Sequence, residues 1–236
     1  MRQVVLDTET TGLNPNKGDR IVEVGCVEMV GRKLTGRHFH YYINPERDIP
    51  EEVIAVHGID NERVKDSPKF RDIAEELWVW LEGAELVIHN AAFDMGFLNE
   101  EFRRFAKENN ESFQPLESVC GVLDTLKVAR EKHPGSKVSL DALCKRYNID
   151  NSHRTLHGAL LDSEILADVY LMLTGGQTAL ILDDDDDQQE SVSIDLSGIS
   201  GRGDLITVSL TEAEQQAHEQ FLELLAKKSG KDINWL

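Results

Sequence analysis

The chain has 236 residues, of which 40% are hydrophobic, and this is enough for one or two domains with a substantial core. It carries 43 acidic and 25 basic residues, for a formal charge of −18. This balance argues against a protein that grips nucleic acid through its overall electrostatic field. It still allows an enzyme that touches nucleic acid locally, through metal ions or while held there by a partner.

The cysteines and the hydropathy indicate the compartment. Cys26, Cys120 and Cys144 are odd in number and far apart, which favours reduced thiols over a disulfide framework or a zinc site. No apolar stretch reaches membrane-spanning length, and the N-terminus has no signal-peptide core. We therefore expect a soluble, cytoplasmic protein, monomeric by default, with no membrane partner.

The first 43 residues predict an antiparallel meander. Short apolar or alternating runs at residues 4–6, 21–27 and 33–43 are typical of strands, and a turn signal, Gly31-Arg32, separates the last two.

Beyond residue 48, strands alternate with helices. Helices are predicted at residues 50–57, 69–81, 90–102, 125–132, 140–147 and 158–173, and strands at 85–89 and 119–124. The pattern predicts an α/β layered domain with a mixed sheet flanked by helices, over residues 1–175.

The composition changes after Leu182. Residues 183–187 are five consecutive aspartates, and few large apolar residues follow, so we expect a disordered acidic linker over 183–204. Thr211 begins a predicted helix in the C-terminal tail, residues 205–236. About 30 residues cannot bury a core of their own, so this helical tail is expected to fold against a partner.

Asp7 and Glu9 are the first candidate site residues. Alternation along a strand places both carboxylates on one face, where they repel each other and are costly to desolvate. A divalent cation such as Mg²⁺ or Mn²⁺ would relieve this repulsion. The alternative is a turn in which Asp7 and Thr8 cap the next segment and Gly12 supplies a positive φ.

Asp94, His157 and Asp162 are further candidates. Asp94 lies in the first turn of a predicted helix but shares its inward face with Phe97; the alternative role is stabilisation of the helix dipole. Asp162 falls on the apolar stripe of the last helix, where a carboxylate is hard to explain structurally. His157 can reach the same place only from the loop before that helix.

These segments resemble a known family. Residues 7–12 (DTETTG), 89–94 (HNAAFD) and 157–162 (HGALLD) resemble, in order and spacing, the three motifs of the DnaQ-like DEDD exonuclease superfamily. The histidine five positions before the last aspartate is similar to that of the His-containing branch. The resemblance implies an RNase H-like fold and 3′→5′ exonuclease activity on DNA for residues 1–175.

The resemblance also implies roles for the acids and the histidine. Asp7, Glu9 and Asp162 would hold one Mg²⁺ or Mn²⁺ ion, and Asp7 would bridge to a second, with Asp94 helping to hold it. Two such ions clamp the attacking and leaving oxygens at phosphorus, and His157 would act as the general base.

Substrate contacts are expected in three places. The backbone N–H groups of Thr10, Thr11 and Gly12 could approach the terminal nucleotide. The segment with His57 and Gly58 resembles one that packs against the terminal base; the alternative is a helix C-cap. His89 and Asn90 touch the scissile strand or simply cap the following helix.

The C-terminal part of the chain, residues 176–236, resembles that of proofreading subunits of bacterial replicative polymerases. Residues 176–182 are similar to a sliding-clamp (beta) binding peptide, with Gln177, Leu180 and Leu182 as the contact residues. The alternative is a plain helix-to-linker transition. The tail, residues 205–236, is similar to the segment that binds the polymerase alpha subunit, and a small theta-like subunit is a further expected partner.

Two rival functions stay open at this point. A related enzyme of the RNase T or oligoribonuclease type would act on RNA 3′ ends, although such enzymes need no 60-residue tail. A non-catalytic adaptor between polymerase and clamp is the other, although all five catalytic positions are filled.

Overall fold

The computed structural model describes residues 1–152 and 156–175, together with the isolated residues 211, 215, 218 and 221. The chain divides into two units, Met1–Ile181 and Leu182–Leu236, and the architecture below belongs to the first. The expected clamp peptide, linker and tail therefore lie outside the continuous described ranges. Within the described residues, no helix is both long and apolar enough to cross a membrane.

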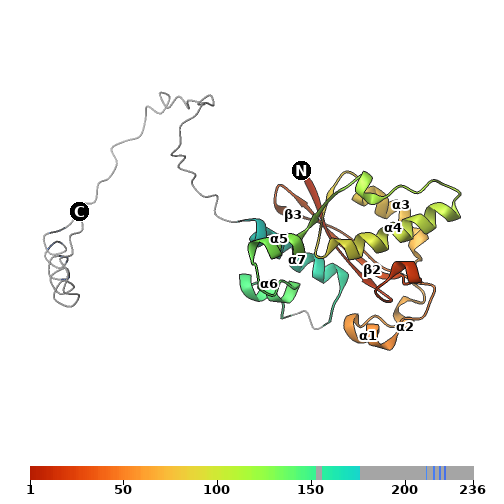
Figure 1. Cartoon of the computed structure of the whole chain (residues 1–236), viewed down its shortest axis with the longest axis horizontal. Helices are drawn as coiled ribbons and strands as arrows, with labels where there is room; N and C mark the ends of the chain where they lie inside the picture. Colours follow the sequence, from red (N-terminus) through yellow and green to blue (C-terminus); the bar gives the residue numbers. More distant parts are fainter. Residues whose placement is uncertain (153–155, 176–210, 212–214, 216–217, 219–220, 222–236) are drawn as a thin grey trace, which may run out of the picture. The chain divides into compact units, whose positions relative to one another are not determined.

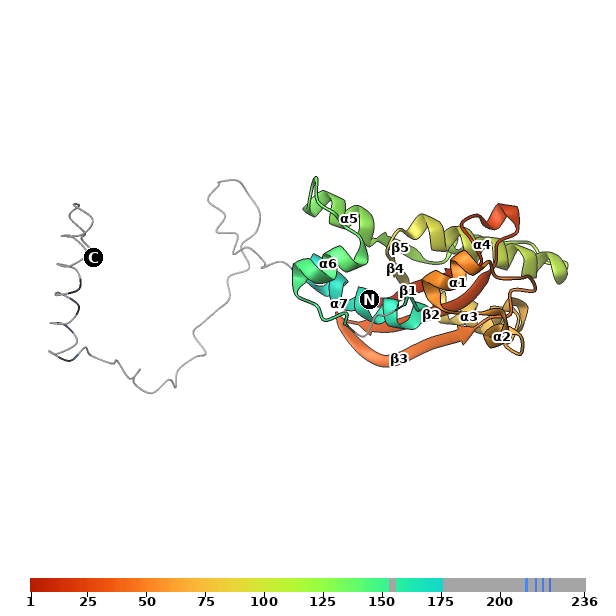
Figure 2. The ribbon, with the colours of Figure 1, turned by 90° about the horizontal axis from the view of Figure 1, so that it is seen from below.

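A five-stranded mixed sheet forms the centre of this unit (Figures 1 and 2). In chain order its strands are β1 (Arg2–Thr10), β2 (Ile21–Val30), β3 (Lys33–Tyr42), β4 (Glu85–Ile88) and β5 (Gly121–Asp124). Their spatial order is β3-β2-β1-β4-β5, so β1 is the middle strand. The pairs β1–β2 and β2–β3 are antiparallel, whereas β4 joins β1 and β5 in parallel. The expected meander and mixed sheet are confirmed.

Seven described helices accompany the sheet. They are α1 (Glu51–His57), α2 (Asn61–Val64), α3 (Phe70–Leu81), α4 (Ala91–Glu108), α5 (Thr125–Lys132), α6 (Leu140–Tyr147) and α7 (Ala159–Thr174). Of these α-helices, α2 alone was not predicted; it is a single turn whose start is capped by Asp60, which accepts the amide of Arg63. One turn gives too few residues for a helical apolar period to show.

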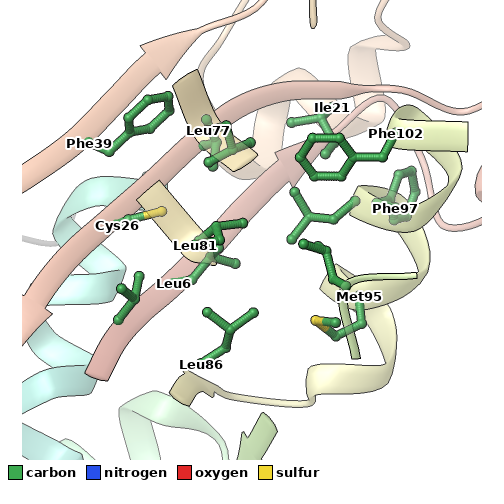
Figure 3. Packing of buried hydrophobic residues seen from close by; sticks show 14 of the residues in the cluster. Leu6, Ile21, Cys26, Phe39, Leu77, Leu81, Leu86, Met95, Phe97 and Phe102 are labelled. Atoms are coloured by element: carbon green, nitrogen blue, oxygen red, sulfur yellow. The ribbon is translucent and has the colours of Figure 1, made fainter. Parts of the chain in front are cut away.

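Side-chain alternation along β1 divides the core into two faces. Val4 and Leu6 belong to the large cluster formed with α3 and α4, in which Leu77, Leu81, Phe97 and Phe102 meet the sheet (Figure 3). Val5 belongs to the opposite cluster, with Leu166 and Tyr170 of α7. The result is a three-layer α/β/α arrangement, consistent with the expected RNase H-like fold.

The same alternation continues into the polar end of β1. Asp7 and Glu9 have the parity of Val5 and so belong to the α7 face, whereas Thr8 has the parity of Leu6 and belongs to the α4 face. One strand end thus presents acids towards one helix layer and a hydroxyl towards the other.

Candidate active site

The N-terminal turn of α7 brings an acid and a histidine to the end of β1. Asp162 lies in the first turn of α7 and is 2% exposed, and His157 lies in the loop just before it, with its side chain 47% exposed. The His157 Nδ1 atom is 3.4 Å from Asp162 Oδ2. Ligand atoms of Glu9, His157 and Asp162 all lie within 4.8 Å of one another. The expected position of His157 in the loop is confirmed.

Asp94 reaches the same strand end from the opposite layer. It lies in the first turn of α4, is 3% exposed, and accepts hydrogen bonds at Oδ1 from the Thr8 amide (3.1 Å) and from the Thr8 hydroxyl (2.7 Å). Burial raises the pKa of Asp94 to about 7, although the bonds from Thr8 oppose this rise. Thr8 stands between Asp7 and Glu9 in β1, so Asp94 is bonded to the residue that separates these two acids.

The local fold at the start of α4 explains this position. Asn90 adopts a left-handed conformation (φ 73°), which turns the chain from β4 directly into the helix. Its amide donates to Asp124 Oδ1 (3.2 Å), the same oxygen that caps α5 through the Leu126 amide. Asp94 therefore sits in a helix N-terminal turn, where the dipole favours a negative charge.

The donor set fits divalent metal ions. Two carboxylates, those of Asp94 and Asp162, are almost inaccessible to water, and a third, that of Glu9, lies with Asp162 in the close group. Buried carboxylates are costly unless a cation compensates them. Oxygen-rich sites of this kind are typical of Mg²⁺ and Mn²⁺.

A cleft of about 620 Å³ opens beside Glu9. It runs between the end of β1, the loop that follows it and α1, and the first turn of α4 contributes to its wall. Its lining includes all three expected loop residues, Thr10, Thr11 and Gly12, together with His57. Such a volume suits a small ligand such as one nucleotide.

The loop residues are held by internal hydrogen bonds. The Thr11 amide donates to the Arg20 carbonyl (2.8 Å), and the Thr11 hydroxyl accepts from the Arg20 amide (3.0 Å). The Thr10 hydroxyl donates to the Gly12 carbonyl (2.6 Å). The Thr11 amide is thus engaged within the protein, and the expected contact of this loop with a nucleotide stays a prediction.

His57 and Gly58 end α1 in the way that a helix C-cap requires. Gly58 is left-handed (φ 73°) and its amide donates to the Ile54 carbonyl (2.7 Å). His57 is 5% exposed, its Nδ1 accepts from the Ile59 amide (3.0 Å), and burial lowers its pKa. The capping alternative is thus correct for Gly58, while His57 also lines the cleft.

His89 and Asn90 differ in their surroundings. His89 Nδ1 is 2.9 Å from the Thr125 hydroxyl, and burial lowers the pKa of this histidine. Asn90 is exposed and occupies the N-cap position of α4, but its side chain makes no capping hydrogen bond. Helix capping by the Asn90 side chain is therefore not what the structure shows.

Several residues of the cleft wall were not predicted, among them Val53 of α1 and Phe93 of α4. Phe93 stands inside the second motif, next to Asp94, and that position was the available signal. The clamp-contact residues Gln177, Leu180 and Leu182 lie outside the described residues.

An α/β/α sheet domain with acids from three chain segments at the end of its middle strand defines a nuclease of the RNase H-like class. Residues 4–170 match the exonuclease family model named RNase T. The chain is 47% identical to DNA polymerase III subunit epsilon of Escherichia coli K12, over 97% of this chain and 95% of that protein. It is 46% identical to the same subunit of Pasteurella multocida, over 99% and 93%.

Solved structures agree in fold. Exonuclease X in complex with 5′ overhanging duplex DNA is 26% identical, with a TM-score of 0.54, over 73% of this chain and 91% of that one. The nuclease domain of 3′hExo, a DEDDh family member bound to rAMP, is 20% identical, with a TM-score of 0.60, over 73% and 90%. The chain belongs to the exonuclease family and, within it, to the DNA polymerase III epsilon subunits. It is a 3′→5′ DNA exonuclease of the proofreading type.

Proposed function

We propose that Asp7, Glu9, Asp94 and Asp162 hold two divalent ions, Mg²⁺ or Mn²⁺, and that His157 is the general base of phosphodiester hydrolysis. The convergence of Glu9, His157 and Asp162 within 4.8 Å, from two distant chain segments, carries this proposal. When bound, such ions stabilise charge that develops at phosphorus and make water a better nucleophile.

The position of His157 supports its role as a base. Its side chain is about half exposed and can meet a water, while Asp162 lies 3.4 Å from Nδ1 and can orient the ring. An imidazole titrates near neutral pH and can therefore accept a proton there. The water oxygen bonds to phosphorus as its proton passes to His157, and the bond from phosphorus to the 3′-oxygen breaks. The 3′-oxygen takes up a proton from solvent, and a nucleoside 5′-monophosphate leaves.

The cleft between the β1 end and α1 would hold the terminal nucleotide. His57, Thr10 and Gly12 line it, with the Val53 and Phe93 side chains as apolar surface for a base. Because the chain as a whole is strongly acidic, binding away from this cleft is expected to be weak. Weak binding favours frayed, mispaired 3′ ends, which cost little to unstack.

Two further partners are assigned to the C-terminal part of the chain, residues 176–236. Residues 205–236 would bind the alpha subunit of DNA polymerase III, and residues 176–182 the beta sliding clamp. Residues 183–204 would serve as a tether that raises the effective concentration of each contact. A theta-like subunit on the exonuclease domain and a cytoplasmic location complete the proposal, which is supported by the near full-length similarity to epsilon subunits.

The experiment is digestion of matched single-stranded DNA and RNA oligomers, with Mg²⁺, with Mn²⁺ or with EDTA. We expect nucleoside monophosphates from DNA with either metal, none with EDTA, and slower digestion of RNA. Faster digestion of RNA would favour the RNase T-type alternative. If neither oligomer gives a metal-dependent product, the non-catalytic adaptor function is favoured.

A further inference from the structure

A buried carboxylate outside the expected site connects β2 to the start of α7. Glu23 is 2% exposed and lies in β2, a mostly apolar strand whose other acid is Glu28. Its Oε2 accepts the backbone N–H of Ala159, the first residue of α7, at 3.0 Å. Its Oε1 lies 2.7 Å from His40 Nε2 on β3.

The position of the Glu23 carboxylate in the sheet carries an electrostatic cost. Glu23 pairs directly with Glu9 across the β1–β2 ladder, and like charges directly opposite each other destabilise a sheet. The N-terminus of α7 offsets this cost, because its unpaired amides and its dipole favour a negative charge. The contact therefore stabilises the buried Glu23 carboxylate and, at the same time, the position of the first turn of α7.

Two neighbouring contacts fix the same helix turn. The Ser163 hydroxyl donates to the Gly25 carbonyl at 2.9 Å. Gly25 has no side chain, and a Cβ there would lie 2.2 Å from the Leu160 amide nitrogen. The first turn of α7 thus packs directly on β2. Of the contacts made by Glu23, Ser163 and Gly25, the Glu23 contact is the one that a carboxylate makes.

The residues on either side of Ala159 are those of the proposed chemistry. His157 precedes Ala159 by two positions, and Asp162 follows it by three. A shift of this turn would move the acid and the base together, and a misplacement near 1 Å can cost about 10²-fold in rate.

We propose that Glu23, oriented by His40, is a positioning residue that fixes Asp162 and His157 relative to the end of β1. The inference rests on the proposed roles of those two residues. Glu23 is proposed to act through these two residues and not as a metal ligand, because its two oxygens contact the Ala159 amide and His40.

The test compares Glu23→Ala, Glu23→Gln and a matched control in the full chain. Glutamine keeps an oxygen for the Ala159 amide and so should rescue function, whereas alanine removes the contact. The control is Glu28→Ala, because Glu28 is on the same strand, is 3% exposed and is bonded to Arg2, but lies at the other end of β2.

Four quantities are measured: kcat and KM on a single-stranded DNA oligomer, Mn²⁺ affinity without DNA, and the unfolding temperature of the metal-free protein. For Glu23→Ala we expect kcat to fall about 10–100-fold and Mn²⁺ affinity at least about fivefold, with KM changed less than about threefold. Glu23→Gln should recover most of both losses. Glu28→Ala should lower the unfolding temperature yet leave kcat and Mn²⁺ affinity within about twofold.

Other outcomes overturn the inference. It is wrong if Glu23→Ala keeps wild-type kcat and Mn²⁺ affinity, or if Glu23→Gln loses as much of both as Glu23→Ala. Should Glu23→Ala not fold, His40→Ala replaces it, because it removes only the partner of Glu23; a loss of at least about threefold in kcat is expected, and no loss contradicts the inference.

Asp162→Ala in the same Mn²⁺ titration tests the proposed metal site separately from the proposed role of Glu23. If Asp162→Ala binds Mn²⁺ as the wild type does, the proposed metal site itself fails. If Asp162→Ala loses affinity while Glu23→Ala does not, only the role of Glu23 fails.

Discussion

Thr8 donates two hydrogen bonds to a single oxygen of Asp94, from its amide at 3.1 Å and from its hydroxyl at 2.7 Å. These bonds join β1 to α4 across the face of the sheet opposite α7. They place the fourth acid against the residue that separates Asp7 from Glu9. Asp94 of α4 and Asp162 of α7 thus approach the end of β1 from opposite helix layers.

The burial of Asp94 predicts a pH-dependent stability of the metal-free protein. Its pKa is raised from an ordinary value near 4 to about 7, so between these pH values the folded state binds a proton that the unfolded state does not. Stability should therefore fall as pH rises through this window, and the loss should be complete above pH 7.

Asp94→Asn should remove this contribution, since asparagine can still accept both bonds from Thr8. In EDTA, we expect its unfolding temperature to be similar to that of the wild type near pH 4 and higher at pH 8. Added Mn²⁺ at pH 8 should stabilise the wild type more than the variant. A constant difference in unfolding temperature from pH 4 to pH 8 would show that Asp94 does not titrate as described.

His157→Ala should separate catalysis from metal binding. Loss of a general base is expected to lower kcat by roughly 10²–10⁴, with Mn²⁺ affinity almost unchanged. Steady-state kinetics and Mn²⁺ titration measure the two effects. His38→Ala is the control, because His38 is exposed on β3, and its kcat should equal that of the wild type. Unchanged turnover in His157→Ala would remove His157 from the mechanism.

Gly25→Ala should displace the start of α7. A Cβ at this position would lie 2.2 Å from the Leu160 amide nitrogen, which is backbone and cannot rotate away. We expect a kcat at least about tenfold lower together with a lower unfolding temperature.

Gly121→Ala provides the matched strand-glycine control. The nearest atoms to a Cβ at Gly121 are 3.7 Å away, in Glu85, which is ordinary contact. Its kcat and unfolding temperature should stay close to those of the wild type. Equal behaviour of the two glycine variants would mean that α7 does not need the close approach.

The double substitution Gln177→Ala and Leu180→Ala should abolish binding to the sliding clamp while exonuclease activity on free oligomers stays intact. The reason is that residues 176–182 lie beyond α7, the last helix of the described exonuclease domain. A clamp pull-down and an oligomer digestion measure the two properties. An unaffected pull-down would contradict the assignment of this peptide.

Most of the exonuclease fold could be predicted from local pattern. The stripe of Phe70, Leu77 and Leu81 predicts α3. Ser139 predicts the start of α6, and its hydroxyl accepts the Ala142 amide at 3.3 Å. Such signals are local in sequence, so a single chain shows them. The single turn α2 escaped because it is too short to have a period.

The candidate site could be predicted in composition but only in part in geometry. Asp94 was expected to face inward, and it does, but its bonds to Thr8 depend on the pairing of α4 with β1, which no local pattern encodes. The role of Glu23 could not be predicted, because its partners Ala159 and His40 are brought to it only by the fold.

Anomalous diffraction from crystals soaked in Mn²⁺ and a nucleoside monophosphate tests the metal site most directly. The proposed arrangement predicts two Mn²⁺ peaks at the end of β1, coordinated by carboxylates of Asp7, Glu9, Asp94 and Asp162, with His157 beside them and not bound to either ion. An absence of Mn²⁺ from this strand end, or Mn²⁺ coordinated without Asp94 and Asp162, would contradict it.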